Sequence, residues 1–439
     1  MIPNVSAGPS LLNLNFMTVP MSALLPALLR ILLAGSIAAA LVSCSEATSP
    51  VREFPVLDDV GQSDWASVSV GGDHTCAIKS NGNAYCWGSN QYGQLGVVHS
   101  DTTCGSKDAQ YSCSLVPHQV LPGVKWASIS AGARHTCGIT TDREAFCWGA
   151  NDENQVGDFS PGGPIPAKVS GSLPWTQISA GATHTCAVRS DGALFCWGSN
   201  DRGQLGNGSV TGGGGSLSRV LGLRSPIASV SAGQQRTCAR TTIGTVYCWG
   251  AVWIDRENGL EITRAQSTPQ LVPKAPAMAS LSVGTFTTCG ADASGFAYCW
   301  EANSRGEMGT GTLDGSTSPL RVASDLEFLQ LSAGIVHTCG IITSGAAYCW
   351  GDDSFGQLGV APASLTERCG GPTLPCAKIP VAVFGRQQFT EISTGFGSHV
   401  CGVTVRGNLY CWGLGLSGQR GDGSESFAVY VPAMAREPR

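Results

Sequence analysis

The chain has 439 residues, enough for several ordinary domains or for one large array of repeats. Charged residues make up only 13% of it, glycine occurs 58 times, and the formal net charge is -5. No basic tract of the kind that follows a phosphate backbone occurs along the sequence, so nucleic acid is excluded as an expected partner.

The first 43 residues are expected to be an export signal and not folded protein. Residues 22–43 are almost wholly apolar, with Arg30 as their only charge. Counted from Met17 or Met21, the segment has the short charged region and the apolar stretch of a signal peptide, so the true start is expected at one of these residues. The alternative, an uncleaved membrane anchor, leaves only about 13 apolar residues after Arg30, fewer than the roughly 20 that a span requires.

The end of this segment, Leu41-Val42-Ser43-Cys44, resembles a bacterial lipobox. The resemblance implies that the peptide is cut before Cys44, that Cys44 is lipidated, and that the mature chain is anchored in the cell envelope. Ser45, in place of aspartate, is similar to the signal for release to an outer membrane, which implies the outer membrane or the cell surface. Residues 44–63 would then form the lipidated end and a tether, and residues 64–439 the folded domain.

Seven repeated units follow, each marked by two cysteines that nine residues separate. In every unit the second cysteine lies between Tyr or Phe and Trp, and Ser-x-Gly lies upstream of the first. A period near 50 residues, with short alternating apolar runs and glycine-rich turns, favours a β-propeller or a β-solenoid. The predicted hairpin units are residues 66–96, 127–157, 176–206, 228–250, 279–309, 329–359 and 390–421.

The turn between the paired cysteines predicts how they meet. Ser80-Asn81-Gly82 is typical of a three-residue hairpin loop that ends in a left-handed glycine. Lys79 then faces Asn83. Counting back in step places Cys76 opposite Cys86 at a non-hydrogen-bonded site, where Cα atoms lie about 4.5 Å apart, at the short end of the disulfide range.

The cysteine count fits complete oxidation. Seven hairpin pairs, two pairs in long insertions and Cys44 account for all 19 cysteines, as expected of an exported protein. Free cysteines remain the alternative for a cytosolic chain, whereas zinc is disfavoured because the units lie too far apart to supply four ligands. The predicted disulfides are Cys76–Cys86, Cys137–Cys147, Cys186–Cys196, Cys238–Cys248, Cys289–Cys299, Cys339–Cys349, Cys401–Cys411, Cys104–Cys113 and Cys369–Cys376. Glycine takes the left-handed turn position in six units, and Arg143 takes it in the second, where we expect modest strain.

The repeat Trp-x-x-Ile/Val-Ser-x-Gly-x-x-His-Thr-Cys, followed by Tyr-Cys-Trp-Gly-x-Asn-x-x-Gly-Gln-Leu-Gly, resembles that of the regulator of chromosome condensation family in its bacterial, cysteine-paired form. The resemblance covers roughly residues 64–434 and implies an all-β, seven-bladed propeller. A terminal strand at residues 429–435 is expected to join the first unit's hairpin and close the ring. Residues 54–57 could compete for that role.

Five units carry a histidine two residues before the first cysteine. We expect these histidines to bond the neighbouring blade, because a residue that recurs at one repeat position is typical of a structural contact and not of metal or acid–base chemistry. No cofactor, metal or catalytic set is expected, and the chain is not predicted to be an enzyme. The five are His74, His135, His184, His337 and His399.

Two insertions, residues 97–116 and 360–379, follow the Gly-Gln-Leu-Gly segments of units one and six. In a closed ring they would flank unit seven on one face. We therefore predict that they form the rims of a recognition surface; the alternative is that they are protease-resistant spacers. The candidate contacts are His99, Tyr111, Arg368 and Arg420.

The sequence favours a monomeric, exported, lipid-anchored module that binds a protein or another envelope component, with the membrane reached only through the lipid. The family resemblance implies an alternative, a regulator similar to a guanine nucleotide exchange factor. A weaker alternative is an enzyme that uses the propeller face.

Overall fold

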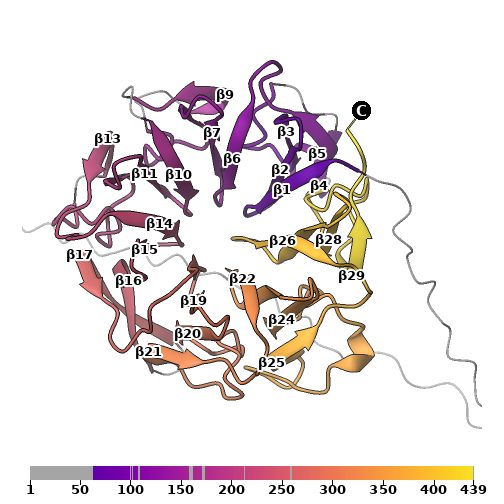
Figure 1. Ribbon diagram of the computed structural model, residues 1–439. Helices are drawn as coiled ribbons and strands as arrows, with labels where there is room; N and C mark the ends of the chain where they lie inside the picture. Colours follow the sequence, from indigo (N-terminus) through magenta and orange to yellow (C-terminus); the bar gives the residue numbers. More distant parts are fainter. Residues whose placement is uncertain are drawn as a thin grey trace, which may run out of the picture. The chain divides into compact units, whose positions relative to one another are not determined.

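The computed structural model describes the propeller domain (Figure 1). The described residues are 63–98, 100, 102–106, 109–157, 162–170, 174–211, 213–257 and 260–438. The predicted signal peptide, Cys44, the tether up to residue 62 and His99 lie outside these ranges, and so do residues 54–57. Within them, no helix has both the length and the apolar character to span a bilayer.

Seven antiparallel sheets surround a central axis, and each sheet is one blade (Figure 1). Strands follow one another in chain order from the axis outward, except that blade 1 adds a fifth, outermost strand, β4. Blade 1 contains β1 (Trp65–Val70), β2 (His74–Lys79), β3 (Ala84–Ser89), β5 (Ala109–Gln119) and β4 (Thr102–Ser106). Blade 2 contains β6 (Trp126–Ala131), β7 (His135–Thr140), β8 (Ala145–Gly149) and β9 (Gly163–Lys168). Blade 3 contains β10 (Trp175–Ala180), β11 (His184–Arg189), β12 (Leu194–Gly198) and β13 (Gly214–Arg219).

The remaining four blades repeat this order, and blade 4 has the longest hairpin. Blade 4 contains β14 (Ile227–Ala232), β15 (Arg236–Thr241), β16 (Val246–Glu257) and β17 (Leu260–Leu271). Blade 5 contains β18 (Ser282–Val283), β19 (Thr287–Ala291), β20 (Ala297–Glu301) and β21 (Ser316–Arg321). Blade 6 contains β22 (Phe328–Ala333), β23 (His337–Ile342), β24 (Ala347–Asp352) and β25 (Cys376–Ala382), with a short 3₁₀ turn, η1 (Pro362–Ser364). Blade 7 contains β26 (Phe389–Thr394), β27 (His399–Thr404), β28 (Leu409–Leu414) and β29 (Ala428–Met434).

The hairpin between the second and third strands has the register that the turn sequence predicts. Cys76 lies directly opposite Cys86, and their Cα atoms are 4.1 Å apart in a disulfide. All seven hairpins carry the equivalent disulfide, with Cα–Cα distances of 4.0–4.1 Å. Gly82 takes the left-handed turn position with φ of 81°, and Arg143 takes it in blade 2 with φ of 64°. Arg143 therefore bears the strain expected of a side chain in that conformation.

The hydrophobic core is divided among the junctions between blades. At the junction of blades 1 and 2, the Cys76–Cys86 disulfide packs with Ile78, Leu95 and Val120 of blade 1 and with two tryptophans of blade 2. These tryptophans are Trp126 and Trp148, whose ring centroids are 5.5 Å apart. One blade cannot bury both of its faces alone, so each disulfide contributes to the contact with the next blade.

The prediction that the terminal strand joins the first unit's hairpin is wrong. β29 pairs with β28 of its own blade, with Ala433 opposite Cys411. The equivalent segment after unit one likewise pairs within blade 1, with His118 opposite Cys86. A repeating sequence does not itself show whether such a segment belongs to the unit before it or after it, and the structure assigns it to the unit before.

The ring closes through contacts between blades 1 and 7 without a shared strand. Trp65 N–H donates to the Gly407 carbonyl at 3.1 Å. Beyond β29, the Glu437 carboxylate lies 2.6 Å from Lys79 Nζ. The end of the chain therefore still ties the last blade to the first, although through side chains.

Candidate binding face

One face of the ring carries two kinds of connection from each blade. Because the strands alternate in direction, the connections from first to second strand and from third to fourth strand emerge on the same side. In blade 1 these are residues 71–73 and the segment that begins at residue 90. We call this side the turn face. Both stapled insertions are third-to-fourth connections and therefore belong to it, as the sequence predicts.

The turns on this face fasten each blade to the next. The Gln94 carbonyl of blade 1 accepts hydrogen bonds from Trp148 Nε1 at 2.9 Å and from Thr136 Oγ1 at 2.8 Å, both in blade 2. The tryptophan bond recurs on the carbonyls of Gln155, Gln204, Glu307, Gln357 and Gln419. The tryptophan after the second cysteine is therefore a contact between blades.

Nearer the axis, the serine of each Ser-x-Gly motif provides a second link. Ser69 Oγ accepts the Ala131 backbone N–H of blade 2 at 2.9 Å, and every blade makes the equivalent bond to its neighbour at 2.9–3.0 Å. Six of these serines, all but Ser332, line a narrow cavity of about 120 Å³ on the axis. The motif therefore serves assembly of the ring.

The repeated histidines form a third link, as the sequence predicts. His74 Nε2 lies 2.8 Å from Thr136 Oγ1 of the next blade, and three other histidines make the same bond to a threonine. Complete burial lowers the pKa of His74 to about 3. These histidines are neutral near pH 7 and closed off from solvent, so they do not offer acid–base chemistry to a ligand.

The junction of blades 4 and 5 departs from this plan. Arg236 takes the histidine position, and its Nη1 lies 2.6 Å from Glu301 Oε2 in a fully buried ion pair. Thr288 Oγ1 donates to the same carboxylate oxygen at 2.8 Å, and Trp253 N–H also bonds this carboxylate. Blade 4 has the long β16–β17 hairpin in place of a Gln turn, so Glu301 takes the place of the missing turn carbonyl.

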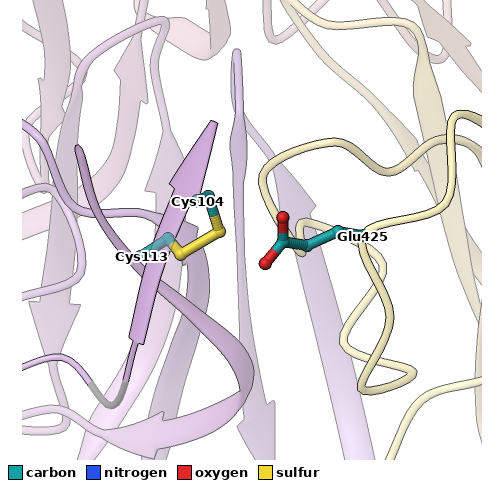
Figure 2. Close-up of side chains that lie close together, drawn as sticks. All are labelled: Cys104, Cys113 and Glu425. Atoms are coloured by element: carbon teal, nitrogen blue, oxygen red, sulfur yellow. A yellow bond between two sulfur atoms is a disulfide. The ribbon is translucent and has the colours of Figure 1, made fainter. Parts of the chain in front are cut away.

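The insertion of blade 1 packs on blade 7. Tyr111 Oη lies 2.7 Å from Ser417 Oγ, and the Leu115 carbonyl accepts the Gly423 N–H at 3.1 Å. Figure 2 shows the Cys104–Cys113 disulfide beside the Glu425 carboxylate of blade 7. Ligand atoms of these three residues lie within 4.8 Å of one another. Both sulfurs are joined in the disulfide, so only the carboxylate can serve as an ionic ligand to a metal.

The insertion of blade 6 points away from blade 7. Arg305 Nη1 of blade 5 donates to the Cys369 carbonyl at 3.0 Å. The expectation that both insertions flank blade 7 is therefore wrong. The physical reason is general in this ring: the fourth strand of a blade lies against the turn of the preceding blade, so an insertion before that strand extends toward the preceding blade.

The structure places the four predicted contact residues in different surroundings. Tyr111 bonds blade 7, and His99 lies outside the described residues. Arg368 is exposed and donates to the Leu365 and Glu367 carbonyls of its own loop.

The prediction that Arg420 contacts a partner is wrong, because its side chain is fully buried. It stands at the buried leucine position of the Gly-Gln-Leu-Gly turn. Its guanidinium bonds Asp422 Oδ2 at 3.0 Å, Ser424 Oγ at 2.8 Å and the Ser426 carbonyl at 3.0 Å. Arg420 therefore shapes the blade-7 loop from within.

Two features of the turn face were not anticipated. A hollow of about 580 Å³ lies between blades 1 and 2, lined in part by Asn90, Tyr92, Ser112 and Asp152. The second feature is the long β16–β17 hairpin, on which Ile254 and Leu260 are 44% and 69% exposed.

These features define a closed β-propeller whose repeated polar side chains are used between blades and whose variable surface lies in the third-to-fourth connections. Residues 65–94, 126–155, 175–204 and 328–357 match a family model described as the regulator of chromosome condensation (RCC1) repeat. A second model with the same description matches residues 81–139, 144–188 and 191–240. The chain therefore carries RCC1 repeats.

Relatives are similar over very different lengths. The ultraviolet-B receptor UVR8 of Arabidopsis thaliana is 29% identical over 366 residues, which are 81% of this chain and 67% of that protein. The X-linked retinitis pigmentosa GTPase regulator homolog of Caenorhabditis elegans is 38% identical over 93 residues, 21% of this chain and only 6% of that protein. Among solved structures, Prp20p of Saccharomyces cerevisiae superposes with a TM-score of 0.69 at 18% identity, over 85% of this chain and 88% of that one. This last likeness shows the shared fold.

Proposed function

We propose that the chain is an exported, lipid-anchored propeller that binds a protein, or another component of the cell envelope, through its turn face. One observation carries the proposal. Eighteen of the 19 cysteines are paired in nine disulfides, and the nineteenth is Cys44, at the end of the segment that resembles a lipobox. Disulfides form and persist in oxidising compartments, and a lone cysteine at the end of an apolar leader suits acylation.

Binding suits the turn face better than catalysis. The five repeated histidines are buried between blades, whereas both stapled insertions and the long β16–β17 hairpin belong to connections on this face. The solved structure of Prp20p is described together with its binding to Gsp1p and histones. A propeller of the same fold therefore serves as a protein-binding scaffold, and we infer the same general role for this chain without inferring the same partners.

Fractionation of producing cells tests the anchor. The full chain should sediment with membranes and enter the detergent phase, and Cys44→Ala should release it or leave it unprocessed. Cys104→Ala with Cys113→Ala is the matched control, because it also removes cysteines but leaves the lipobox intact. A wild-type chain found in the soluble cytosolic fraction, with thiols open to alkylation, would contradict the proposal. Affinity capture from solubilised envelopes then tests binding.

A further inference from the structure

Four fourth strands continue beyond the body of their blades; that of blade 7 adds a single pair, Ala428 with Leu414, whereas those of blades 1, 4 and 6 lead into an insertion or a long hairpin. The body ends where the glycine after the repeated tryptophan pairs with the fourth strand: Gly88 with Ser114, Gly250 with Gln266, and Gly351 with Ala377. One position further out, the partners are Cys113 in blade 1, Ala265 in blade 4 and Cys376 in blade 6. These three residues therefore occupy the same place at the outer rim of their sheets.

In two of these blades, the chain itself covers the outer edge of the extension. In blade 1, β4 pairs along β5 with Thr102 opposite Cys113, and Cys104 fixes it there by disulfide. In blade 6, Cys376 N–H donates to the Glu367 carbonyl at 3.4 Å, and Cys369 supplies the disulfide. Both stapled insertions thus return a segment to the same edge at the same register. Covering an edge in this way blocks pairing with other chains.

The matching edge of β17 is bare within the part of the chain that the structure describes. The Ser267 carbonyl faces outward, because it accepts the Gly208 N–H of blade 3 at 2.9 Å. Backbone groups alternate in direction along a strand, so the N–H and C=O groups of Ala265, Thr263 and Glu261 face outward too. No strand pairs with these three residues on that side in the described ranges.

We propose that this edge, residues 260–265, binds an extended segment of a partner protein, which pairs antiparallel to β17 as a fifth strand of blade 4. The proposal rests on the proposed protein-binding function and gives it a location. The mode is the one that blade 1 already uses internally with β4. Main-chain hydrogen bonds would supply affinity, and side chains at alternate positions would supply specificity.

The outward side chains indicate the chemistry of the segment. Leu260, Ile262 and Arg264 lie on one face of β17; Leu260 is 69% exposed and Arg264 is exposed. Arg264 has no acidic partner among the described residues. A segment that fits would carry apolar residues opposite Leu260 and Ile262 and an acidic residue near Arg264. Opposite charges across a strand pair are favourable, whereas like charges are not.

The edge is held ready for such a partner. On the other face of the hairpin, Trp253 is 7% exposed and its Nε1 donates to Glu261 Oε2 at 2.7 Å. Trp253 N–H bonds Glu301, which is itself paired with Arg236. The hairpin is therefore anchored to the junction of blades 4 and 5 before a partner arrives. A fixed edge loses less entropy on binding than a mobile loop does.

The test uses the purified, oxidised full chain and a phage-displayed library of random 12-residue peptides. Enriched peptides are synthesised and their affinities measured for the wild type, Ala265→Pro and Ala265→Ser. Proline removes the outward N–H without removing a bond to β16, and serine keeps it. We expect about a tenfold loss of affinity with proline, the effect of one lost hydrogen bond, and about no change with serine. Arg264→Glu should also lower the affinity for acidic peptides, because it replaces the attracting charge with a repelling one.

Hydrogen exchange provides a second readout that does not depend on a variant. Addition of a peptide should slow exchange of the Ala265 and Thr263 amides in the wild type, with β15 unchanged. Peptides that bind the wild type and Ala265→Pro equally, or that protect other amides, would overturn this site and leave a protein-binding role standing. Self-association of the chain that Ala265→Pro abolishes would also overturn it, by showing that the occupant is a second copy.

Discussion

Arg236 and Glu301 form a buried ion pair at the junction of blades 4 and 5, where four other junctions pair a histidine with a threonine. Both residues depart from the repeat at once. Glu301 stands where other blades have a left-handed glycine, and it keeps that conformation with φ of 87°. Such a backbone costs about 1–2 kcal/mol for a residue with a Cβ atom. The ion pair and the bond from Trp253 hold Glu301 in place against this cost.

A double-mutant cycle tests whether these two substitutions compensate one another. Arg236→His alone buries an unpaired carboxylate, and Glu301→Gly alone buries an unpaired guanidinium. Each should lower the free energy of unfolding by about 3–5 kcal/mol. The double variant places a histidine near Thr288, as at the other junctions, and leaves neither charge buried alone, although the turn carbonyl stays absent; it should lose less than the sum. Urea unfolding measures all four proteins; additive losses would show that the two residues are independent.

The valine before the first cysteine of blade 7 predicts a stabilising substitution. His337 of blade 6 has no hydrogen-bond partner for Nε2 in the described structure, and the position where other blades place threonine holds Val400. Val400→Thr should restore the missing bond and raise the free energy of unfolding by about 1 kcal/mol. The matched control, Thr136→Val, removes the existing bond to His74 and should lower it by a similar amount. A destabilising Val400→Thr would contradict this account of the junction.

Acid should reduce the contribution of the buried histidines to the free energy of unfolding before it protonates these histidines in the folded state. Burial lowers the pKa of His135 from 6.5 to about 3. Between these values the unfolded chain binds a proton that the folded chain does not, so this residue's contribution to stability falls as the pH drops from about 6.5 toward 3. The slope is up to about 1.4 kcal/mol per pH unit.

Buried carboxyl groups change the stability in the opposite direction as the pH falls. The effect of His135 is therefore measured by comparing the wild type with a variant that lacks this histidine. Burial raises the pKa of Glu307, Asp353 and Glu391 to about 7, and their contribution is lost as the pH rises from their ordinary values toward 7. Comparing the wild type with His135→Gln cancels these groups. The wild type should lose stability relative to the variant between pH 6 and pH 4 in chemical denaturation. A difference that does not change with pH would contradict the buried, neutral state of His135.

The disulfide of the blade-1 insertion should control a local opening. Cys104→Ala with Cys113→Ala releases β4 from β5, and hydrogen exchange of residues 102–106 should then become much faster. The ring closes elsewhere as well, so we expect the β2–β3 hairpin to keep its protection. Cys369→Ala with Cys376→Ala is the matched control and should affect only blade 6. Loss of protection throughout blades 1 and 7 would show instead that the ring depends on this staple.

The sequence predicts the repeat-level structure well because local chemistry decides it. The Ser80-Asn81-Gly82 turn fixes the register of its hairpin, and the register brings Cys76 to Cys86. The resemblance to a known family then implies seven blades. The position of the last strand was not predictable from local pattern, because the β29 segment resembles the segments that precede the other units, and its pairing is set by contacts distant in sequence.

Departures from the repeat carry structural information that the repeat itself does not. Arg420 aligns with a leucine that is buried in other blades, so its burial was open to prediction. Arg236 and Glu301 are departures in adjacent units, which signals a contact between them. The long hairpin of blade 4 had a signal too: the sequence at residues 258–259 is Asn-Gly, the dipeptide most typical of tight hairpins. The side toward which an insertion leans depends on how blades pack, which no single unit reveals.

The state of the cysteines in the cell tests the exported, lipid-anchored account most directly. Free thiols are alkylated in intact producing cells, the chain is isolated, and its non-reduced peptides are mapped by mass spectrometry. The account predicts nine disulfides, each within one blade or one insertion, and an N-terminal peptide that begins at a lipid-modified Cys44. Alkylated cysteines in the hairpins, or an unmodified Cys44 inside a longer N-terminal peptide, would contradict it.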